Sequence, residues 1–206
     1  VELYPHSYLR VEGFEIRGHT WDETIYVKDY SGTAVYGIEI VNCYIHDNAG
    51  DGIYARGGST STHNCLIENN EIFNNGQAGM LGAWTECLIR ANNIHHNNDD
   101  GISSGFSGTI IELNTIYDQY ESNQHQDGIM IGSANNTIIR YNKIYDFTQN
   151  IYANLIDDPG RYIENLDIYG NVIYTIAANY PDAPSIFIRM DAGATGHITG
   201  LFIHSN

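Results

Sequence analysis

Positive charge is scarce in this sequence. Of its 206 residues only 9 are Lys or Arg, against 25 Asp or Glu, and the formal net charge is −16. Proteins that bind nucleic acid or anionic membranes need clustered Lys and Arg to neutralise phosphates. The composition therefore argues against both of these partners, and it is compatible with the binding of cations or of a neutral polymer.

Cysteine and long apolar segments are scarce as well. The 3 cysteines are an odd number, which predicts no closed disulfide framework. Cys65 and Cys87 are expected to be buried thiols, and the alternative is a disulfide between their neighbouring strands. No run of about 18 apolar residues exists, so no membrane-spanning helix is expected. The first residues do not have the pattern of a signal peptide. We expect a secreted or cell-surface protein from which the signal has already been removed.

What the sequence does contain is an internal repeat, anchored by the triplet Asn-x-Ile. Successive anchors lie 22 to 30 residues apart; the clear copies are at 70–72, 92–94, 114–116, 142–144 and 171–173, and the degenerate ones at 14–16, 43–45 and 201–203. A β-branched residue stands five positions before every anchor Ile, as expected for inward positions of stacked parallel strands. This second column consists of Val11, Ile40, Ile67, Ile89, Ile111, Ile139, Ile168 and Ile198.

A third apolar segment follows each triplet after a polar turn, for example at Gly52-Ile53, Gly79-Met80 and Gly101-Ile102. Three short strands per repeat, with no helical periodicity, predict an all-β parallel solenoid of about seven coils. The recurrent Asn is interpreted as a ladder at a sharp bend between strands, where its side chain bonds the turn backbone. We assign it a structural role rather than a chemical one.

Over nearly the whole chain these repeats resemble the right-handed parallel β-helix superfamily, without pointing to one subfamily. The resemblance implies a single domain over residues 1–206. The coils run into both ends and no amphipathic cap helix is legible, so we expect a segment of a longer solenoid, or ends covered by other chains. Within the superfamily, pectate-lyase-like, polygalacturonase-like, alginate-lyase-like and epimerase-like proteins share such coils with tailspikes and adhesins, so the fold alone does not fix the function.

One outward column of the first strand is expected to form a ladder of alternating charge that fixes the stacking of coils. It contains Glu68, Arg90, Glu112 and Arg140. A column of glycines at positions 52, 79, 101 and 128 has two interpretations: a shallow groove that admits a ligand, or only the tight turn before the third strand.

Outward positions of the third strand carry the candidate substrate-binding residues. Tyr54 and Arg56 lie one coil below Tyr26 and Lys28, and Trp84 follows at a strand end. Flat aromatic faces suit sugar rings, and Lys or Arg suits a uronate carboxylate. The substrate-binding prediction therefore rests on Lys28, Tyr54, Arg56 and Trp84. The alternative is that the aromatic residues only stabilise the stack of coils.

Acidic residues gather in the polar turns that precede the third strand, where register places Asp51, Ala78, Asp100 and Asp127 in one line. Asp100 and Asp127 are the candidate catalytic carboxyls, with His125 assisting, because two neighbouring acids can divide the work of acid and base. They can equally bind Ca²⁺, for which Asp99 and Glu121 are further candidate ligands. The alternative is a solvated turn without chemistry.

The segment Asp99-Asp100-Gly101-Ile102-Ser103 resembles the paired-Asp motif of polygalacturonases, although the Gly-His-Gly and Arg-Ile-Lys motifs of that family are missing. In the hydrolase branch the resemblance implies that paired Asp residues act on the glycosidic bond. In the lyases it implies that Ca²⁺ and a Lys or Arg abstract the proton beside a uronate. We therefore expect an extracellular lyase or glycoside hydrolase acting on an acidic polysaccharide. The alternative is a non-catalytic carbohydrate-binding, adhesin, tailspike or filament-forming β-helix.

Overall fold

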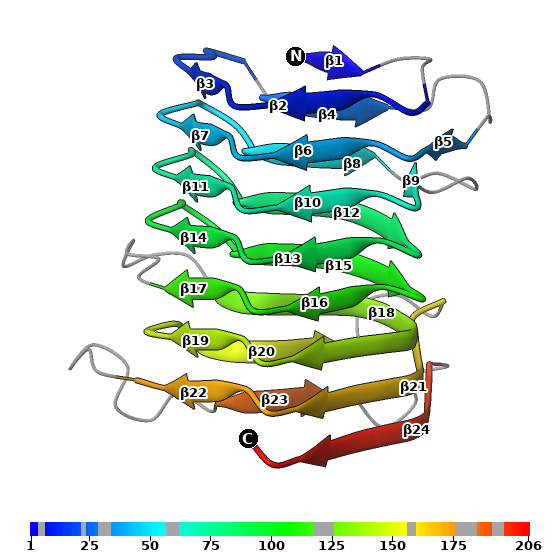
Figure 1. Ribbon diagram of the computed structural model, residues 1–206. Coiled ribbons are helices and arrows are strands. Elements are labelled where there is room, and N and C mark those ends of the chain that lie inside the picture. The colour runs from blue at the N-terminus through cyan, green and yellow to red at the C-terminus, as the bar shows by residue number, and fades with distance from the viewer. Residues whose placement is uncertain are drawn as a thin grey trace.

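The computed structural model describes residues 1–3, 7–21, 24–28, 34–56, 62–117, 126–155, 160–175, 185–190 and 196–206. In this part of the chain all regular structure is β-strand, and there is no helix that could cross a membrane. The strands wind into coils that stack from β1 (Glu2–Leu3) near the N-terminus to β24 (His197–His204) at the C-terminus (Figure 1). Each coil therefore contacts only its neighbours, as in other solenoids.

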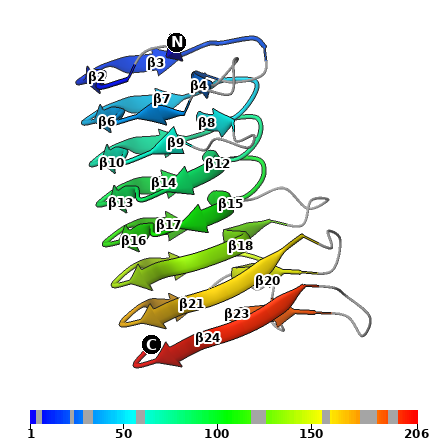
Figure 2. The same ribbon diagram turned by 90° about the vertical axis from the view of Figure 1, so that its right-hand side faces the viewer.

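Three faces make up the solenoid, and the strands of each face pair in parallel (Figures 1 and 2). The first face contains β2 (Arg10–Glu12), β6 (Glu39–Val41), β10 (Leu66–Glu68), β13 (Leu88–Arg90), β16 (Ile110–Glu112) and the second halves of β18 (Asp127–Arg140), β21 (Tyr162–Tyr169) and β24. The second face contains β3 (Glu15–Arg17), β7 (Tyr44–His46), β11 (Glu71–Phe73), β14 (Asn93–His95), β17 (Thr115–Tyr117), β19 (Lys143–Tyr145) and β22 (Val172–Tyr174). The third face contains β1, β4 (Ile25–Lys28), β8 (Ile53–Arg56), β12 (Met80–Thr85), β15 (Ile102–Ser107), the start of β18, β20 (Gln149–Asn154) and β23 (Ile186–Arg189). The short strands β5 (Val35–Tyr36) and β9 (Thr62–His63) lead from the third face towards the first.

The core is the inside of this tube, and the two isoleucine columns that the repeat predicted line two of its three sides, with apolar side chains of the third face on the other. In register, Ile67 pairs with Ile89 on the first face, and Ile72 pairs with Ile94 on the second. All four side chains are fully buried. Because the side-chain period of a strand is two, the residues directly before and after each inward Ile point outward, and they are partly exposed, as Leu66 and Glu68 are around Ile67.

The bend between the first and second faces is built by two successive positions. The first residue adopts the left-handed conformation, as Asn69 does with φ 56°. The second is the anchor Asn, whose side chain turns inward and bonds the coils above and below it. Asn92 Oδ1, for example, accepts hydrogen bonds from the backbone N–H and the Nδ2 of Asn70, and Asn92 Nδ2 donates to the carbonyl oxygen of Ile67. The predicted Asn ladder therefore satisfies the buried polar groups of this turn; its members are Asn70, Asn92, Asn114, Asn142, Asn171 and Asn206.

The charged column of the first face pairs as expected. Arg90 Nε lies 2.7 Å from Glu68 Oε1, and Arg140 Nη2 lies 2.7 Å from Glu112 Oε2. Both pairs join neighbouring coils at partly exposed positions, where each is worth at most about 1 kcal/mol. The three cysteines are free and buried, which confirms the expected buried thiols at Cys65 and Cys87.

The glycine column is not a groove. A Cβ atom on Gly101 would lie 2.5 Å from Ile116 Cγ2 and 2.6 Å from the carbonyl oxygen of Gly128, and Gly52, Gly79 and Gly128 are equally tight. These glycines allow the turn to approach the next coil closely. Of the two interpretations of the column, the structure supports the tight turn.

We expect Gly101→Ala to lower the free energy of unfolding by about 1–3 kcal/mol, because its methyl group meets backbone that cannot move aside. Gly105→Ala is the matched control, since a Cβ there has nothing within 4 Å; its stability should stay within about 0.5 kcal/mol of the parent. Urea unfolding followed by circular dichroism measures both. Equal losses in the two variants would contradict the packing role of the column.

Candidate functional site

The acidic line lies at the turn that leads from the second face into the third. Asp51 Oδ1 accepts a hydrogen bond of 2.9 Å from the backbone N–H of Ala78, one coil on. Asp100 Oδ1 accepts one of 3.0 Å from the backbone N–H of Asp127 in the same way. Asp127 in turn accepts from the backbone N–H of Gln149, its partner in strand register. The structure thus places the predicted acids in one column and gives each carboxyl a backbone amide to bond.

Asp100 and Asp127 are consecutive in this column and both are nearly inaccessible, with 7% and 1% of their surface exposed. Burial, reinforced by the negative charge of Asp99, raises the pKa of Asp100 to about 7, although a hydrogen bond from Ser103 acts in the opposite direction. Burial, followed by the charge of Asp100, raises the pKa of Asp127 to about 9. At neutral pH, Asp127 therefore holds its proton while Asp100 is close to its titration midpoint.

The outer surface of the third face begins beside this column. Tyr54 is half-buried, and its ring stacks on that of Tyr26 with centroids 5.3 Å apart and planes 12° from parallel. A second stack, Tyr152 on Phe187, lies farther along the same outward column. Leu81, Ser103 and Met130 separate the two stacks, so smaller side chains lie between aromatic ones.

The positions of the other predicted binding residues differ. Lys28 and Arg56 pair in the register of β4 and β8, and their side chains lie outside the described part of the structure. Trp84 points into the core with 1% of its surface exposed, which corrects the expectation that its ring lines a substrate path. The reason is that β12 continues through Thr85, so the alternation of Met80, Gly82 and Trp84 keeps pointing inward.

Two features of the third face were not found from the sequence. A β-bulge interrupts the pairing of β15 with β18, because Ser104 pairs with Ile131 whereas Gly105 pairs with Ser133, leaving Gly132 as the extra residue. Arg161 lies over this bulge, since its Nε would be 3.8 Å from a Cβ on Gly132, and its Nη1 donates to the carbonyl oxygen of Asn154. Bulges often occur beside functional sites, where they redirect side chains.

A row of stacked rings, which we call the aromatic ladder, was also missed. It occupies the position after the anchor Ile, with neighbouring centroids 4.5–5.1 Å apart, and consists of His46, Phe73, His95, Tyr117, Tyr145 and Tyr174. His95 is held in this ladder and its Nδ1 lies 2.7 Å from that of His96, which is exposed.

The candidate metal ligands of the acidic line lie partly within the described residues. Among the residues that the structure describes, no three His, Cys, Asp or Glu side chains are grouped to hold a metal ion. Asp99 is exposed, whereas Glu121 and His125 lie outside the described residues. Ca²⁺ binding and the assisting role of His125 therefore stay predictions.

The comparisons with known proteins agree with the architecture. The protein-family model for a right-handed β-helix region matches residues 2–86 of the sequence. The Dettilon tailspike protein has a TM-score of 0.54 and 16% sequence identity, covering 95% of this chain and 45% of its own. The A-module of the mannuronan C-5 epimerase AlgE4 from Azotobacter vinelandii has a TM-score of 0.51 and 20% identity, covering 92% of this chain and 64% of its own.

The chain thus spans less than two thirds of either structure, and no curated protein matches its sequence. At such identities the likeness concerns the fold. Together with the parallel pairing and the repeat, it establishes the class: the chain is a right-handed parallel β-helix.

Proposed function

We propose that this β-helix acts on a polysaccharide and cleaves its glycosidic bonds by general acid–base catalysis, with Asp100 and Asp127 as the central carboxyls. The observation that carries the proposal is the pair itself: two buried acids in neighbouring coils, with pKa values raised to about 7 and about 9. A carboxyl that keeps its proton at neutral pH can protonate a leaving oxygen. One that titrates near pH 7 can take a proton from water.

A polysaccharide substrate is supported by the fold comparison and by the third face. The similar module from Azotobacter vinelandii is an enzyme named for its action on mannuronan. On the same face, the stack of Tyr26 and Tyr54 ends two coils before the coil of Asp100 and offers aromatic surface, and Arg161 offers a guanidinium that fits the carboxylate of an acidic sugar. These features support an acidic glycan as the substrate class.

A divalent cation and an extracellular location belong to the same proposal. The chain has a formal net charge of −16, so it repels an acidic glycan over the range set by ionic screening. Ca²⁺ bound with the participation of Asp99 and Glu121 would offset this repulsion. Its expected signature is a cleavage rate that falls when a chelator is added and recovers when Ca²⁺ is restored.

A non-catalytic role is the second candidate, and the hydrogen bonds of the acids favour it. Asp51 and Asp100 each accept a backbone N–H from the next coil, which is a structural function like that of the Asn ladder. Asp127 is almost completely buried, which restricts its contact with a ligand. Under this alternative the coil binds a glycan without changing it, as a tailspike segment or an adhesin would.

The test compares Asp100→Asn with Asp51→Asn in product assays on uronate and neutral glycans, with and without Ca²⁺. Reducing ends report hydrolysis, and ultraviolet absorbance reports elimination. Both variants keep an Oδ1 that can accept the amide of the next coil, but only Asp100→Asn removes a carboxyl of the acid pair. We expect Asp100→Asn to lose about 10²–10⁴-fold in rate and Asp51→Asn to stay within a few-fold of the parent. Activity that survives in Asp100→Asn, or glycan binding without any product, would overturn the catalytic proposal.

A further inference from the structure

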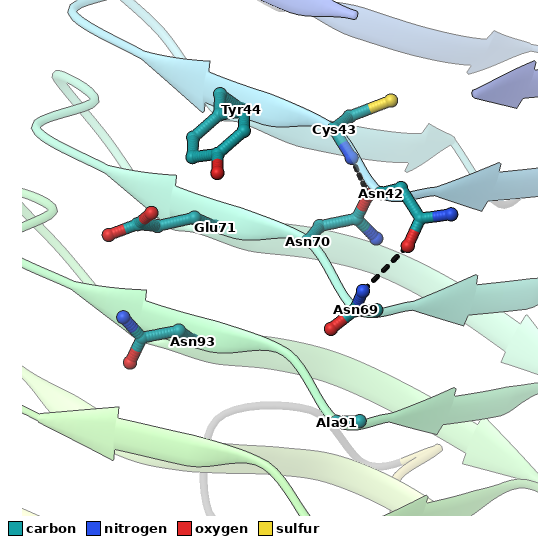
Figure 3. Close-up of a pocket in the computed structure, with 8 residues that line it drawn as sticks. All are labelled: Asn42, Cys43, Tyr44, Asn69, Asn70, Glu71, Ala91 and Asn93. Atoms are coloured by element: carbon teal, nitrogen blue, oxygen red, sulfur yellow. Dashed lines mark hydrogen bonds between the residues drawn. The ribbon is translucent and has the colours of Figure 1, made fainter. Parts of the chain in front are cut away.

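A hollow of about 250 Å³ lies at the corner between the first and second faces, on the outer side of the Asn ladder (Figure 3). It spans three consecutive coils and is lined by Asn42, Cys43, Tyr44, Asn69, Asn70, Glu71, Ala91 and Asn93. The strands of the second face, three residues long, separate this corner from the turn that carries the acid pair. The hollow is therefore a different surface from the proposed catalytic edge.

The hollow exists because one position of the bend has a small side chain. The left-handed residues of successive coils are Asn69, Ala91, Leu113 and Tyr141. Leu113 and Tyr141 are large and exposed, whereas Ala91 projects only a methyl group. Space therefore opens beside Ala91, between Asn69 and the outward residues of β11 and β14.

Its polar groups are distributed between two layers. Asn70 belongs to the ladder and uses its side chain within the turn. The outer layer is only lightly engaged: Asn69 Nδ2 donates to Asn42 Oδ1, and the side chain of Asn93 has no hydrogen-bond partner among the described residues. Glu71 faces the hollow and interacts weakly with His95, its Oε1 lying 3.3 Å from Nε2. Amide and carboxylate groups are thus available to a ligand.

Tyr44 forms one wall of the hollow, projecting beside Glu71 in Figure 3. It is 55% exposed, and within the described part of the chain its ring stacks on no other, unlike the rings of the aromatic ladder and of the third face. An exposed ring with an apolar face and a polar hydroxyl is a surface that a ligand can cover while the hydroxyl stays hydrogen-bonded.

The charge of the lining selects the ligand. It contains no Lys or Arg and one carboxylate, Glu71, so an anionic sugar would be repelled. One carboxylate also falls short of the six to eight oxygens that Ca²⁺ takes. Asn side chains offer donors and acceptors together, which suits hydroxyl groups.

We propose that this hollow is a binding subsite for a neutral saccharide unit, with the ring of Tyr44 as the platform and Asn69, Glu71 and Asn93 as partners of the sugar hydroxyls. The subsite goes beyond the proposed function, because it involves neither the acid pair nor an acidic glycan. It gives the solenoid two carbohydrate-facing surfaces of different charge preference.

Isothermal titration of the intact chain with the neutral hexasaccharides cellohexaose, maltohexaose and mannohexaose tests the subsite, with hexagalacturonate as the acidic comparison. Under the proposal at least one neutral hexasaccharide binds with a dissociation constant of about 1 mM or tighter, a range typical of a small open site. Tyr44→Ala and Asn93→Ala each weaken that binding by about tenfold. The matched controls, Tyr141→Ala on the same edge and Thr115→Ala in the same outward column as Asn93, change it less than twofold.

Three outcomes would overturn the proposal: no binding of any of the three neutral hexasaccharides, binding unchanged in Tyr44→Ala, or equal losses in the Tyr141→Ala control. Urea unfolding of each variant excludes a loss of fold as the cause. Asp100→Asn separates the two proposals, because it removes cleavage while leaving binding at the hollow intact. Failure of one leaves the result for the other unchanged.

Discussion

Replacing Asn114 by Asp should lower the free energy of unfolding by about 3–5 kcal/mol, although the two side chains have nearly the same shape. Asn114 is buried, and its Oδ1 accepts hydrogen bonds from the backbone N–H and the Nδ2 of Asn92. Its own Nδ2 donates to the carbonyl oxygen of Ile89 and to Asn142 Oδ1. An Asp keeps the acceptor but sets a second oxygen against the two acceptor oxygens of Ile89 and Asn142, in a buried site that screens a charge poorly.

The matched control for this substitution is Asn136→Asp. Asn136 is exposed, and its Oδ1 accepts from Asn165 Nδ2, a bond that a carboxylate preserves. Its stability should change by less than about 0.5 kcal/mol. Urea unfolding at pH 7, followed by far-ultraviolet circular dichroism, measures both. Similar losses of stability in the two variants would show that the hydrogen bonds of the Asn ladder are not the reason why Asn114 stabilises the fold.

The fold could be predicted because each coil repeats the same sequence pattern. One β-branched inward position, such as Ile67, is compatible with many structures. The same position repeated through eight copies, always five residues before the anchor Ile, is compatible with stacked parallel strands. The Asn ladder follows from the same alignment, since a buried Asn that recurs at a bend must bond its own copies in adjacent coils.

The orientation of single residues was less accessible where a strand is longer than its repeat suggests. Trp84 was expected at a strand end, but β12 runs six residues and keeps Trp84 inward. The inward Gly82 two residues earlier was the available signal. For the glycine column, the sequence does not contain the deciding quantity, which is the distance of about 2.6 Å between a Cβ on Gly101 and the backbone of the next coil.

Some features of the candidate site could be predicted from the sequence, and others could not. Register alone placed Asp100 and Asp127 in one column, but their raised pKa values depend on burial, which the packing of neighbouring turns decides. The aromatic ladder was within reach of the alignment, one position after the anchor Ile. Arg161 was not, because it reaches the third face from a segment between repeat positions.

The acid pair makes the second large prediction: Asp127→Asn should be more stable than the parent at alkaline pH. The pKa of Asp127 is about 9 in the folded chain, against about 4 for an unfolded Asp. Between these values the folded state holds a proton that the unfolded state has released, so the free energy of unfolding falls as the pH rises. The decrease is about 1.4 kcal/mol for each pH unit.

The interval from pH 7 to pH 9 isolates the contribution of Asp127. The raised pKa of Asp100 is about 7, so above pH 7 Asp100 no longer lowers the free energy of unfolding further. Across this interval the parent should lose about 2–3 kcal/mol relative to Asp127→Asn, and Asp51→Asn should follow the parent. Urea unfolding at pH 7, 8 and 9 provides the comparison. Parallel curves for the parent and Asp127→Asn would show that Asp127 is already ionised in the folded chain at pH 7.

The same variant separates the two candidate functions of the acidic line. An Asn at position 127 can accept the amide of Gln149 as the carboxyl does, so a purely structural column would gain stability and lose nothing. A buried acid that destabilises the chain at neutral pH is instead typical of a site retained for chemistry. If Asp127 supplies the proton to the leaving oxygen, Asp127→Asn becomes more stable while glycan cleavage falls about 10²–10⁴-fold. Greater stability with unchanged cleavage would assign the carboxyl to the scaffold.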